Sequence, residues 1–105
     1  MKKTTLYIGL NDKDTKAQEI STEHAKTYVF CTLPKYVDGA TVTTAEGLYT
    51  HENGTTVIEN TIKIEILEFD ENTHENILEF ARLAKSYFNQ ESVAIQTLEV
   101  ESVLY

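Results

Sequence analysis

The most regular pattern in the chain is the stretch IENTIKIEI, residues 58–66. Ile62, Ile64 and Ile66 alternate with polar residues, and Ile58 lies in the same phase. A repeat of two residues is typical of a strand that buries one face and exposes the other. We therefore expect a strand here, with its isoleucines in the core of the domain.

The sequence before this stretch predicts the other half of a hairpin. Residues 40–50 are rich in Thr, Val and Tyr, which is the composition of a strand. Asn53-Gly54 follows, and this dipeptide strongly favours a tight hairpin turn. Gly47 lies inside the predicted strand, where a glycine indicates a bulge or a close backbone approach.

A strand and a helix precede the hairpin. Leu6, Ile8 and Leu10 alternate with other residues and predict a first strand. Ser21 stands where a helix N-cap is expected, directly before a segment with apolar residues three and four apart. Pro34 disfavours helical geometry at the residue before it, so this helix should end near residue 33.

A second helix and a last strand follow the hairpin. Asn72 and Glu75 have the spacing of a capping box, which predicts that the helix begins there. The last strand is expected at residues 93–104, where the apolar residues change phase. A bulge near Gln96-Thr97 is the preferred explanation, and a strand covered on both faces is the alternative. The apolar stripe of the second helix consists of Ile77, Phe80, Ala81, Ala84, Tyr87 and Phe88.

The order of elements is therefore strand, helix, strand, strand, helix, strand. Short connections and right-handed crossovers favour the split βαβ arrangement for this order. We expect a single α+β domain over residues 1–105, with a ferredoxin-like βαββαβ fold. Its four-stranded antiparallel sheet should carry both helices on one face. The strand residues expected in the core are Leu6, Ile8, Leu10, Val42, Leu48, Ile58, Ile62, Ile64 and Ile66.

The other face of this sheet has no helix to cover it, and we call it the open face. Tyr7, Tyr49, Val57 and Leu67 are expected there. Exposed tyrosines among aliphatic side chains are typical of association surfaces, which predicts a homodimer or a partner surface. The alternative is an ordinary solvated face, which antiparallel sheets tolerate.

Acidic residues crowd the end of the third strand and the start of the second helix. One interpretation is favourable placement at a helix N-terminus. The other is an acidic patch that binds a basic protein surface, since complementary charge speeds such encounters. The residues expected to bind a partner in this patch are Glu68, Asp70, Glu71, Glu75 and Glu79.

The composition argues against several functions. Nine basic and seventeen acidic residues give a formal net charge of −8, which disfavours direct binding to nucleic acid or to an anionic membrane. Three dispersed histidines and one cysteine offer no metal-ligand spacing, and the glycines form no phosphate-binding loop. We therefore expect no metal, no cofactor and no assignable catalytic residue. Cys31 is expected to be a small buried hydrophobe.

The N-terminal segment does not have the pattern of a signal peptide. Lys2-Lys3 is followed by a short apolar stretch that runs directly into Asn11-Asp12. A secretory signal needs a longer apolar region and a cleavage site with small residues. This pattern predicts a cytoplasmic protein with a reduced thiol.

Four segments resemble a known family. They are Leu6-Tyr7-Ile8-Gly9-Leu10, Glu46-Gly47-Leu48-Tyr49 with Asn53-Gly54, Glu59-Asn60-Thr61, and Asn89-Gln90-Glu91-Ser92-Val93. In these the chain is similar to small bacterial and mobile-element (phage-type) proteins catalogued only as a domain of unknown function. The resemblance implies a ferredoxin-like α+β domain without an established activity. A setting in phages or integrated elements would favour binding to a host component.

Two functional hypotheses follow, from different classes. The first is a non-enzymatic binding protein that acts on a macromolecule through its acidic patch or open face, such as an inhibitor of a host nucleic-acid-binding system. The alternative is a small-ligand-binding or enzymatic domain with a pocket between the helices and the sheet. The first is favoured because the sequence has no nucleophile–base pair, metal motif or phosphate-binding loop.

Overall fold

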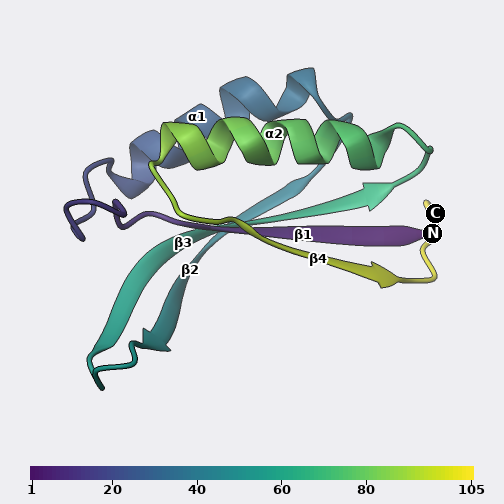
Figure 1. Cartoon of the computed structure of the whole chain (residues 1–105). Coiled ribbons are helices and arrows are strands. Elements are labelled where there is room, and N and C mark those ends of the chain that lie inside the picture. Colours follow the sequence, from purple (N-terminus) through teal and green to yellow (C-terminus); the bar gives the residue numbers. More distant parts are fainter.

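A computed structural model describes all residues, 1–105, as one antiparallel sheet with a layer of helices on it (Figure 1). The elements are β1 (Lys2–Gly9), α1 (Thr22–Thr32), a short 3₁₀ turn η1 (Leu33–Lys35), β2 (Thr41–Thr50), β3 (Thr56–Glu68), α2 (Thr73–Tyr87) and β4 (Ala94–Glu99). The strand order is β2-β3-β1-β4, and every neighbouring pair is antiparallel. The expected ferredoxin-like α+β fold is confirmed.

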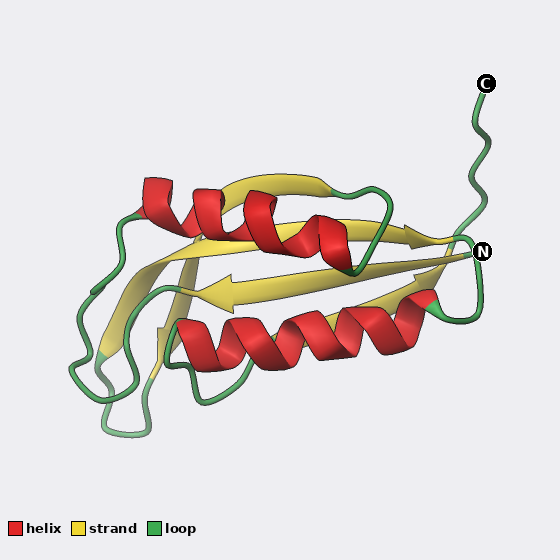
Figure 2. Cartoon of the chain, turned by 90° about the horizontal axis from the view of Figure 1, so that it is seen from above, coloured by secondary structure: helices red, strands yellow, loops and turns green.

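Both helices cover the same face of the sheet and lie side by side on it (Figure 2). The core between the two layers is made of aliphatic and aromatic side chains from β1, β3, α1 and α2. Leu6, Ile62, Ile64 and Phe80 have no exposed surface. The alternation in residues 62–66 therefore places its isoleucines as expected.

The first helix begins and ends where local chemistry predicts. The Ser21 hydroxyl accepts a hydrogen bond from the backbone N–H of His24 at 3.1 Å, which satisfies one of the free donors of the first turn. After Thr32 the chain tightens into η1, with Pro34 near its start. Proline is favourable there because its missing N–H would have no helical partner.

The second helix begins differently from the expectation. Asn72 precedes α2 but its side chain makes no capping hydrogen bond. The Asp70 carboxylate accepts from the backbone N–H groups of Asn72 and Thr73, and from the Thr73 hydroxyl. The helix thus begins at the predicted place, but the predicted capping box is wrong, because Asp70 accepts the Asn72 N–H that Glu75 would accept in such a box.

The far half of the β2–β3 hairpin extends beyond the helices. We call residues 44–60 the arm; it bends away from the helix layer (Figure 1). Leu48 and Ile58 pair across the arm, yet they are 68% and 61% exposed. The expectation that both are core residues is wrong, because no helix reaches over this part of the sheet.

The last strand is shorter and more regular than expected. β4 ends at Glu99 and pairs with β1 in continuous register from Lys2↔Glu99 to Tyr7↔Ala94. The expected bulge at Gln96-Thr97 is therefore absent, and residues 100–105 form no strand. The change of phase falls inside β4, where Ile95 and Leu98 are 37% and 59% exposed, so the strand has no single buried face that would require a bulge. None of the helices is both long and apolar enough to cross a membrane.

Candidate functional site

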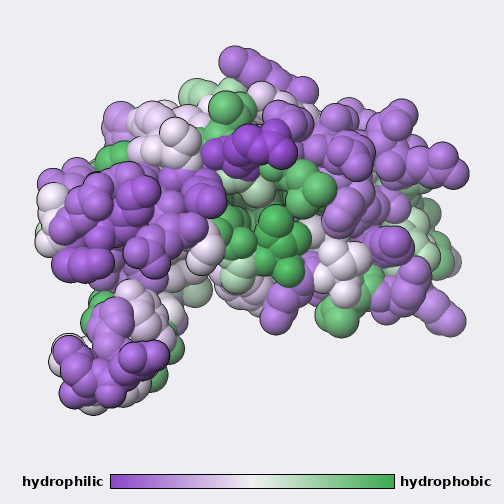
Figure 3. Space-filling model, in the orientation of Figure 1, coloured by the Kyte–Doolittle hydropathy of each residue, from purple (hydrophilic) through white to green (hydrophobic).

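A large cavity lies on the open face, where the arm bends away from the rest of the sheet. It has a volume of about 730 Å³. Figure 3 shows the tip of the arm as a separate lobe, with a hollow between it and the body of the molecule. The strand residues that line it are Tyr7, Gly9, Tyr49, Val57, Glu59, Thr61 and Ala94. This cavity does not lie between the helices and the sheet, where the alternative hypothesis places a pocket and where the hydrophobic core is found.

Strand register explains why these side chains meet. Gly9 pairs with Thr61, Glu59 with Gly47, and Val57 with Tyr49. Paired residues in antiparallel strands point to the same face, and residues two apart on one strand do so as well. Residues 57, 59 and 61 are therefore out of phase with the core isoleucines and face the cavity.

The Glu59 carboxylate lies in the cavity directly against the backbone of Gly9, and we call this position its seat. A Cβ atom at Gly9 would lie 2.6 Å from Glu59 Oε1, so only a residue without a side chain fits under this carboxylate. The backbone N–H of Asn11 donates to Glu59 Oε2 at 3.0 Å. A second glycine, Gly47, is opposite Glu59 in the register, and a Cβ there would be 3.2 Å from Thr61 Oγ1. The predicted close approach at Gly47 is thus a contact with a side chain, and the register shows no bulge.

The loop of residues 11–16 forms one wall and is held by the segment that follows α2. Buried Gln90 donates from Nε2 to the Asn11 carbonyl oxygen at 2.7 Å. Asn89, whose φ is +50°, donates to the carboxylates of Asp12 and Asp14. The N–H of Thr15, the Asn89 amide and the N–H of Asp14 hold the pKa of Asp12 below its ordinary value of 3.8. The wall is therefore a structured loop.

Aromatic rings form the opposite side. Tyr49 and His51 of the hairpin meet edge to face, with ring centroids 5.0 Å apart. The Lys63 ammonium lies 5.9 Å from the centroid of the Tyr7 ring. A seated carboxylate beside tyrosine faces is an arrangement that attracts a cationic or planar aromatic ligand.

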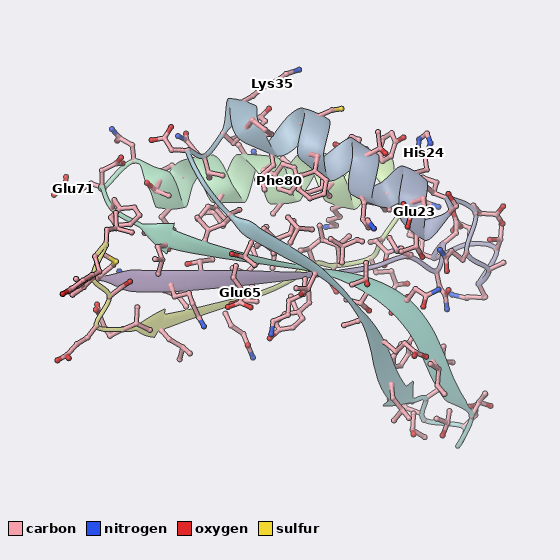
Figure 4. All side chains as sticks on the ribbon, turned by 180° about the vertical axis from the view of Figure 1, so that it is seen from behind. Glu23, His24, Lys35, Glu65, Glu71 and Phe80 are labelled. Atoms are coloured by element: carbon pink, nitrogen blue, oxygen red, sulfur yellow. The ribbon has the colours of Figure 1, made fainter.

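The residues of the expected acidic patch do not form one free surface. The Glu68 carboxylate is only 6% exposed and binds the Thr4 hydroxyl and His74 Nδ1. Asp70 caps α2, and Glu79 pairs with Arg82. Glu71 and Glu75 are exposed. Figure 4 shows Glu71 at the opposite end of the molecule from the arm, far from the cavity.

The residues expected to mediate self-association separate into two places. Tyr7, Tyr49 and Val57 line the cavity, whereas Leu67 lines a smaller one of about 300 Å³ beside Phe69 and Asp70. Glu65 also lines the smaller cavity, and it lies on the side of the sheet away from the helices (Figure 4). A hydrogen bond from Lys3, the charge of Lys3 and the charge of Lys63 lower the pKa of Glu65 below its ordinary value of 4.5.

The histidines and the cysteine do not converge. His24 Nε2 lies 2.8 Å from the Tyr87 hydroxyl oxygen, His74 contacts Glu68, and His51 contacts Tyr49. Cys31 is exposed, so its expected burial is wrong; its side of α1 faces solvent, as the neighbouring Phe30 does at 59% exposure. No three His, Cys, Asp or Glu side chains come together as metal ligands.

Reasoning from the sequence missed the central residue of the cavity. Glu59 entered the sequence analysis only as one of the polar residues that alternate with isoleucine and as part of the Glu59-Asn60-Thr61 segment that resembles the family. The usable signal was its pairing with glycines: once the hairpin turn at Asn53-Gly54 sets the register, Glu59 falls opposite Gly47. A carboxylate between glycines on a sheet has room to lie against the backbone.

The structure resembles solved structures of a phage enzyme. A phage SAM lyase in complex with S-methyl-5′-thioadenosine superposes with a TM-score of 0.67 and 22% identity, covering 93% of this chain and 80% of that one. The phage SAM lyase in its apo state gives a TM-score of 0.61 and 21% identity, covering 92% and 78%. No curated protein sequence matches the chain. At this identity the likeness establishes a shared fold.

These comparisons correct the first functional hypothesis. A non-enzymatic protein acting on a macromolecule through an acidic patch or the open face is contradicted, because the fold is shared with an enzyme solved with a small ligand. The likeness favours the alternative, a small-ligand-binding or enzymatic domain. The resemblance to a phage-type family without known activity is confirmed. The family model described as "Protein of unknown function (DUF3574)" matches residues 3–103, and the chain belongs to this family.

Proposed function

We propose that this chain binds an adenosyl sulfonium compound of the S-adenosylmethionine class in the cavity and cleaves one of its carbon–sulfur bonds. The observation that carries the proposal is the seated Glu59 carboxylate in a nucleoside-sized cavity, on the fold of a SAM lyase. The proposal rests on the cavity and the fold together, since fold alone does not imply an activity.

The cavity suits such a ligand in size and lining. Its volume of about 730 Å³ lies within the range of about 300–1,000 Å³ that is usual for small-molecule sites. The faces of Tyr7 and Tyr49 supply stacking surfaces for an adenine ring. The Glu59 carboxylate and these rings together favour a positively charged sulfur over a neutral one.

For cleavage of the carbon–sulfur bond, the main task of the protein is to hold the sulfonium compound in a reactive orientation. When the bond between the sulfonium sulfur and the amino-acid side chain breaks, its electron pair moves to sulfur and leaves a neutral thioether, S-methyl-5′-thioadenosine. The carbon fragment then loses a proton or is closed by its own carboxylate, and no water is added. Glu59 faces the developing centre, where its charge can orient the sulfonium or accept that proton.

The test is direct turnover. Purified protein is incubated with S-adenosylmethionine, and S-methyl-5′-thioadenosine is measured by chromatography and mass spectrometry. We expect accumulation with the wild type and a loss of about 100-fold or more with Glu59→Gln, in line with removal of a positioned acid–base or charged group. Glu75→Gln removes an exposed carboxylate on α2 outside the cavity and should retain full activity.

A negative result would be clear. If the wild type neither releases the thioether nor binds any adenosyl ligand in calorimetry, the proposal is wrong. If it binds S-adenosylmethionine without cleaving it, the chain is a binding domain for this class and the lyase chemistry is excluded.

We also propose that copies of the chain associate through the open face, around Tyr7, Tyr49 and Val57. The supporting observation is that this face has no helix over it, and Tyr49 is 43% exposed. A second copy placed there would exclude water from the cavity.

A further inference from the structure

We propose that Lys13 is a specificity-determining residue that binds a carboxylate of the ligand, so that the cavity selects molecules carrying a free amino-acid group. This inference rests on the proposed function and adds to it the part of the ligand that Glu59 and the tyrosines do not recognise.

Cations are scarce in this chain, and those of the cavity are not used in ion pairs. There are nine basic residues against seventeen acidic ones. Carboxylate partners hold Lys3, Lys26, Lys63 and Arg82. Lys13 and Lys16 form no such pair, and both line the cavity. In an acidic protein, two unpaired cations at one cavity point to an anionic group of a ligand.

The two lysines are not equivalent. Lys16 Nζ donates to the backbone carbonyl oxygen of Lys13 at 2.6 Å, so its ammonium is already engaged within the loop. The Lys13 ammonium has no carboxylate within ion-pair distance and makes no hydrogen bond to the rest of the chain. Lys13 is therefore the cation that remains available to a ligand.

The backbone of Lys13 is held in place for this role. Its N–H donates to the Asn89 carbonyl oxygen at 3.0 Å. The preceding residue, Asp12, is held by two hydrogen bonds. Its carboxylate accepts from the Asn89 side-chain amide, and its carbonyl oxygen accepts from the backbone N–H of Lys16 at 2.8 Å. A side chain presented by an ordered loop loses less entropy on binding than one on a free segment.

The charges of the cavity are separated in space. Glu59 lies on the strand floor, whereas Lys13 lies on the loop wall. Besides the two tyrosines, the other charged or titratable groups of the lining are Asp12, Lys16, His51 and Glu91. Asp12 is occupied by its own loop and by Asn89. A free cation and a seated carboxylate on different walls match a ligand with opposite charges, and an α-amino acid joined to a sulfonium is such a ligand.

Two neutral thioethers separate this role from the lyase chemistry, because neither contains the sulfonium. S-adenosylhomocysteine carries the amino-acid group, whereas S-methyl-5′-thioadenosine carries a methyl group in its place. We expect the wild type to bind S-adenosylhomocysteine more tightly in calorimetry. Lys13→Met should weaken S-adenosylhomocysteine about tenfold, as for loss of one charge-assisted contact, and change S-methyl-5′-thioadenosine less than about twofold.

The matched control is Lys35→Met. Lys35 is exposed and unpaired, and it lies in η1 outside the cavity, so this variant changes the net charge equally. It should bind both thioethers as the wild type does. Equal weakening of both ligands by Lys13→Met, or no change in either, would overturn the role of Lys13 and leave the proposed function intact. If the wild type binds neither thioether nor S-adenosylmethionine, the proposed function fails and this inference fails with it.

Discussion

Strands β2 and β3 run through both the body of the sheet and the arm, and the two regions differ in what covers them. In the body, Ile62, Ile64 and Ile66 lie under the helices with at most 1% of their surface exposed. In the arm, Ile58 continues the same phase four residues earlier and is 61% exposed. Burial of an alternating strand is thus decided by the presence of a second layer and not by the strand pattern.

The difference has a structural consequence. The covered part of the sheet has a packed interior. The uncovered part bends away and leaves the cavity on the open face. The hydrophobic core and the cavity of the proposed site therefore lie on opposite faces of one sheet.

The largest effect should come from shortening an isoleucine in the body. Ile64→Ala is expected to lower the free energy of unfolding by about 2–5 kcal/mol, from lost transfer energy and a cavity. Ile58→Ala in the arm should cost less than about 0.5 kcal/mol, as for an exposed site. Urea denaturation of both variants measures the difference. Equal costs would show that the arm is covered in solution.

Gly9 lies at the junction between body and arm, and a substitution there tests the position of the Glu59 carboxylate. Gly9→Ala puts a methyl group where the Glu59 carboxylate lies, so this carboxylate must leave its seat. Because the end of a flexible side chain can move, we expect little change in stability but a loss of about tenfold in turnover or ligand affinity. Gly39→Ala meets nothing within 4 Å and is the control. Unchanged turnover in Gly9→Ala would separate the seat of Glu59 from the activity.

The pH dependence of stability tests one carboxylate in the loop wall and one in the body of the sheet. The pKa values of Asp12 in the loop and Glu65 in the body are both lowered by folding, from 3.8 and 4.5. Their contributions are therefore complete above these ordinary values and are lost as the pH falls through the lower folded-state values.

We expect the urea midpoint of the wild type to decrease from about pH 5 to about pH 3, and Asp12→Asn or Glu65→Gln to reduce that slope. Both carboxylates are in contact with solvent, so each effect should be small. Glu75→Gln, on the exposed side of α2, should keep the wild-type slope. If neither Asp12→Asn nor Glu65→Gln changed the slope, the lowered pKa values of these two carboxylates would not be the cause of the pH dependence.

The smallest effect is expected for self-association of the chain through the open face. Sedimentation of the wild type at high micromolar concentration should show a dimer or larger species, and Tyr7→Glu combined with Tyr49→Glu should give a monomer. Phe30→Glu changes an exposed aromatic residue of the helix layer and should retain the association. A wild type that remains monomeric would exclude self-association through this face.

Much of the fold could be predicted because its signals are local. The Ser21 cap, the stop at Pro34 and the alternation at residues 62–66 depend on chemistry within a few residues. One failed prediction was local: two neighbouring side chains, Asp70 and Asn72, could bind the backbone at the start of α2, and the sequence did not decide between them. The other depended on a distant part of the chain, because β4 ends at Glu99 where its pairing with β1 ends at Lys2.

Only some residues of the candidate site could be predicted from the sequence. Tyr7, Tyr49 and Val57 were expected on the open face, and they line the cavity. Glu59, Gly9 and Lys13 were not singled out, since each is unremarkable within its own segment. They come together because β1, β3 and the loop of residues 11–16 meet at one end of the sheet.

By itself the sequence determined the order of strands and helices, the face of β3 that is buried and the acidic charge of the surface, because each depends on residue type and short-range periodicity. Only the tertiary structure decided how far the helices extend along the sheet. That length leaves Leu48 and Ile58 exposed and separates the arm from the core. It also decided that the Glu59 carboxylate lies against Gly9, because this contact joins residues that are fifty positions apart and depends on the exact register of two strands.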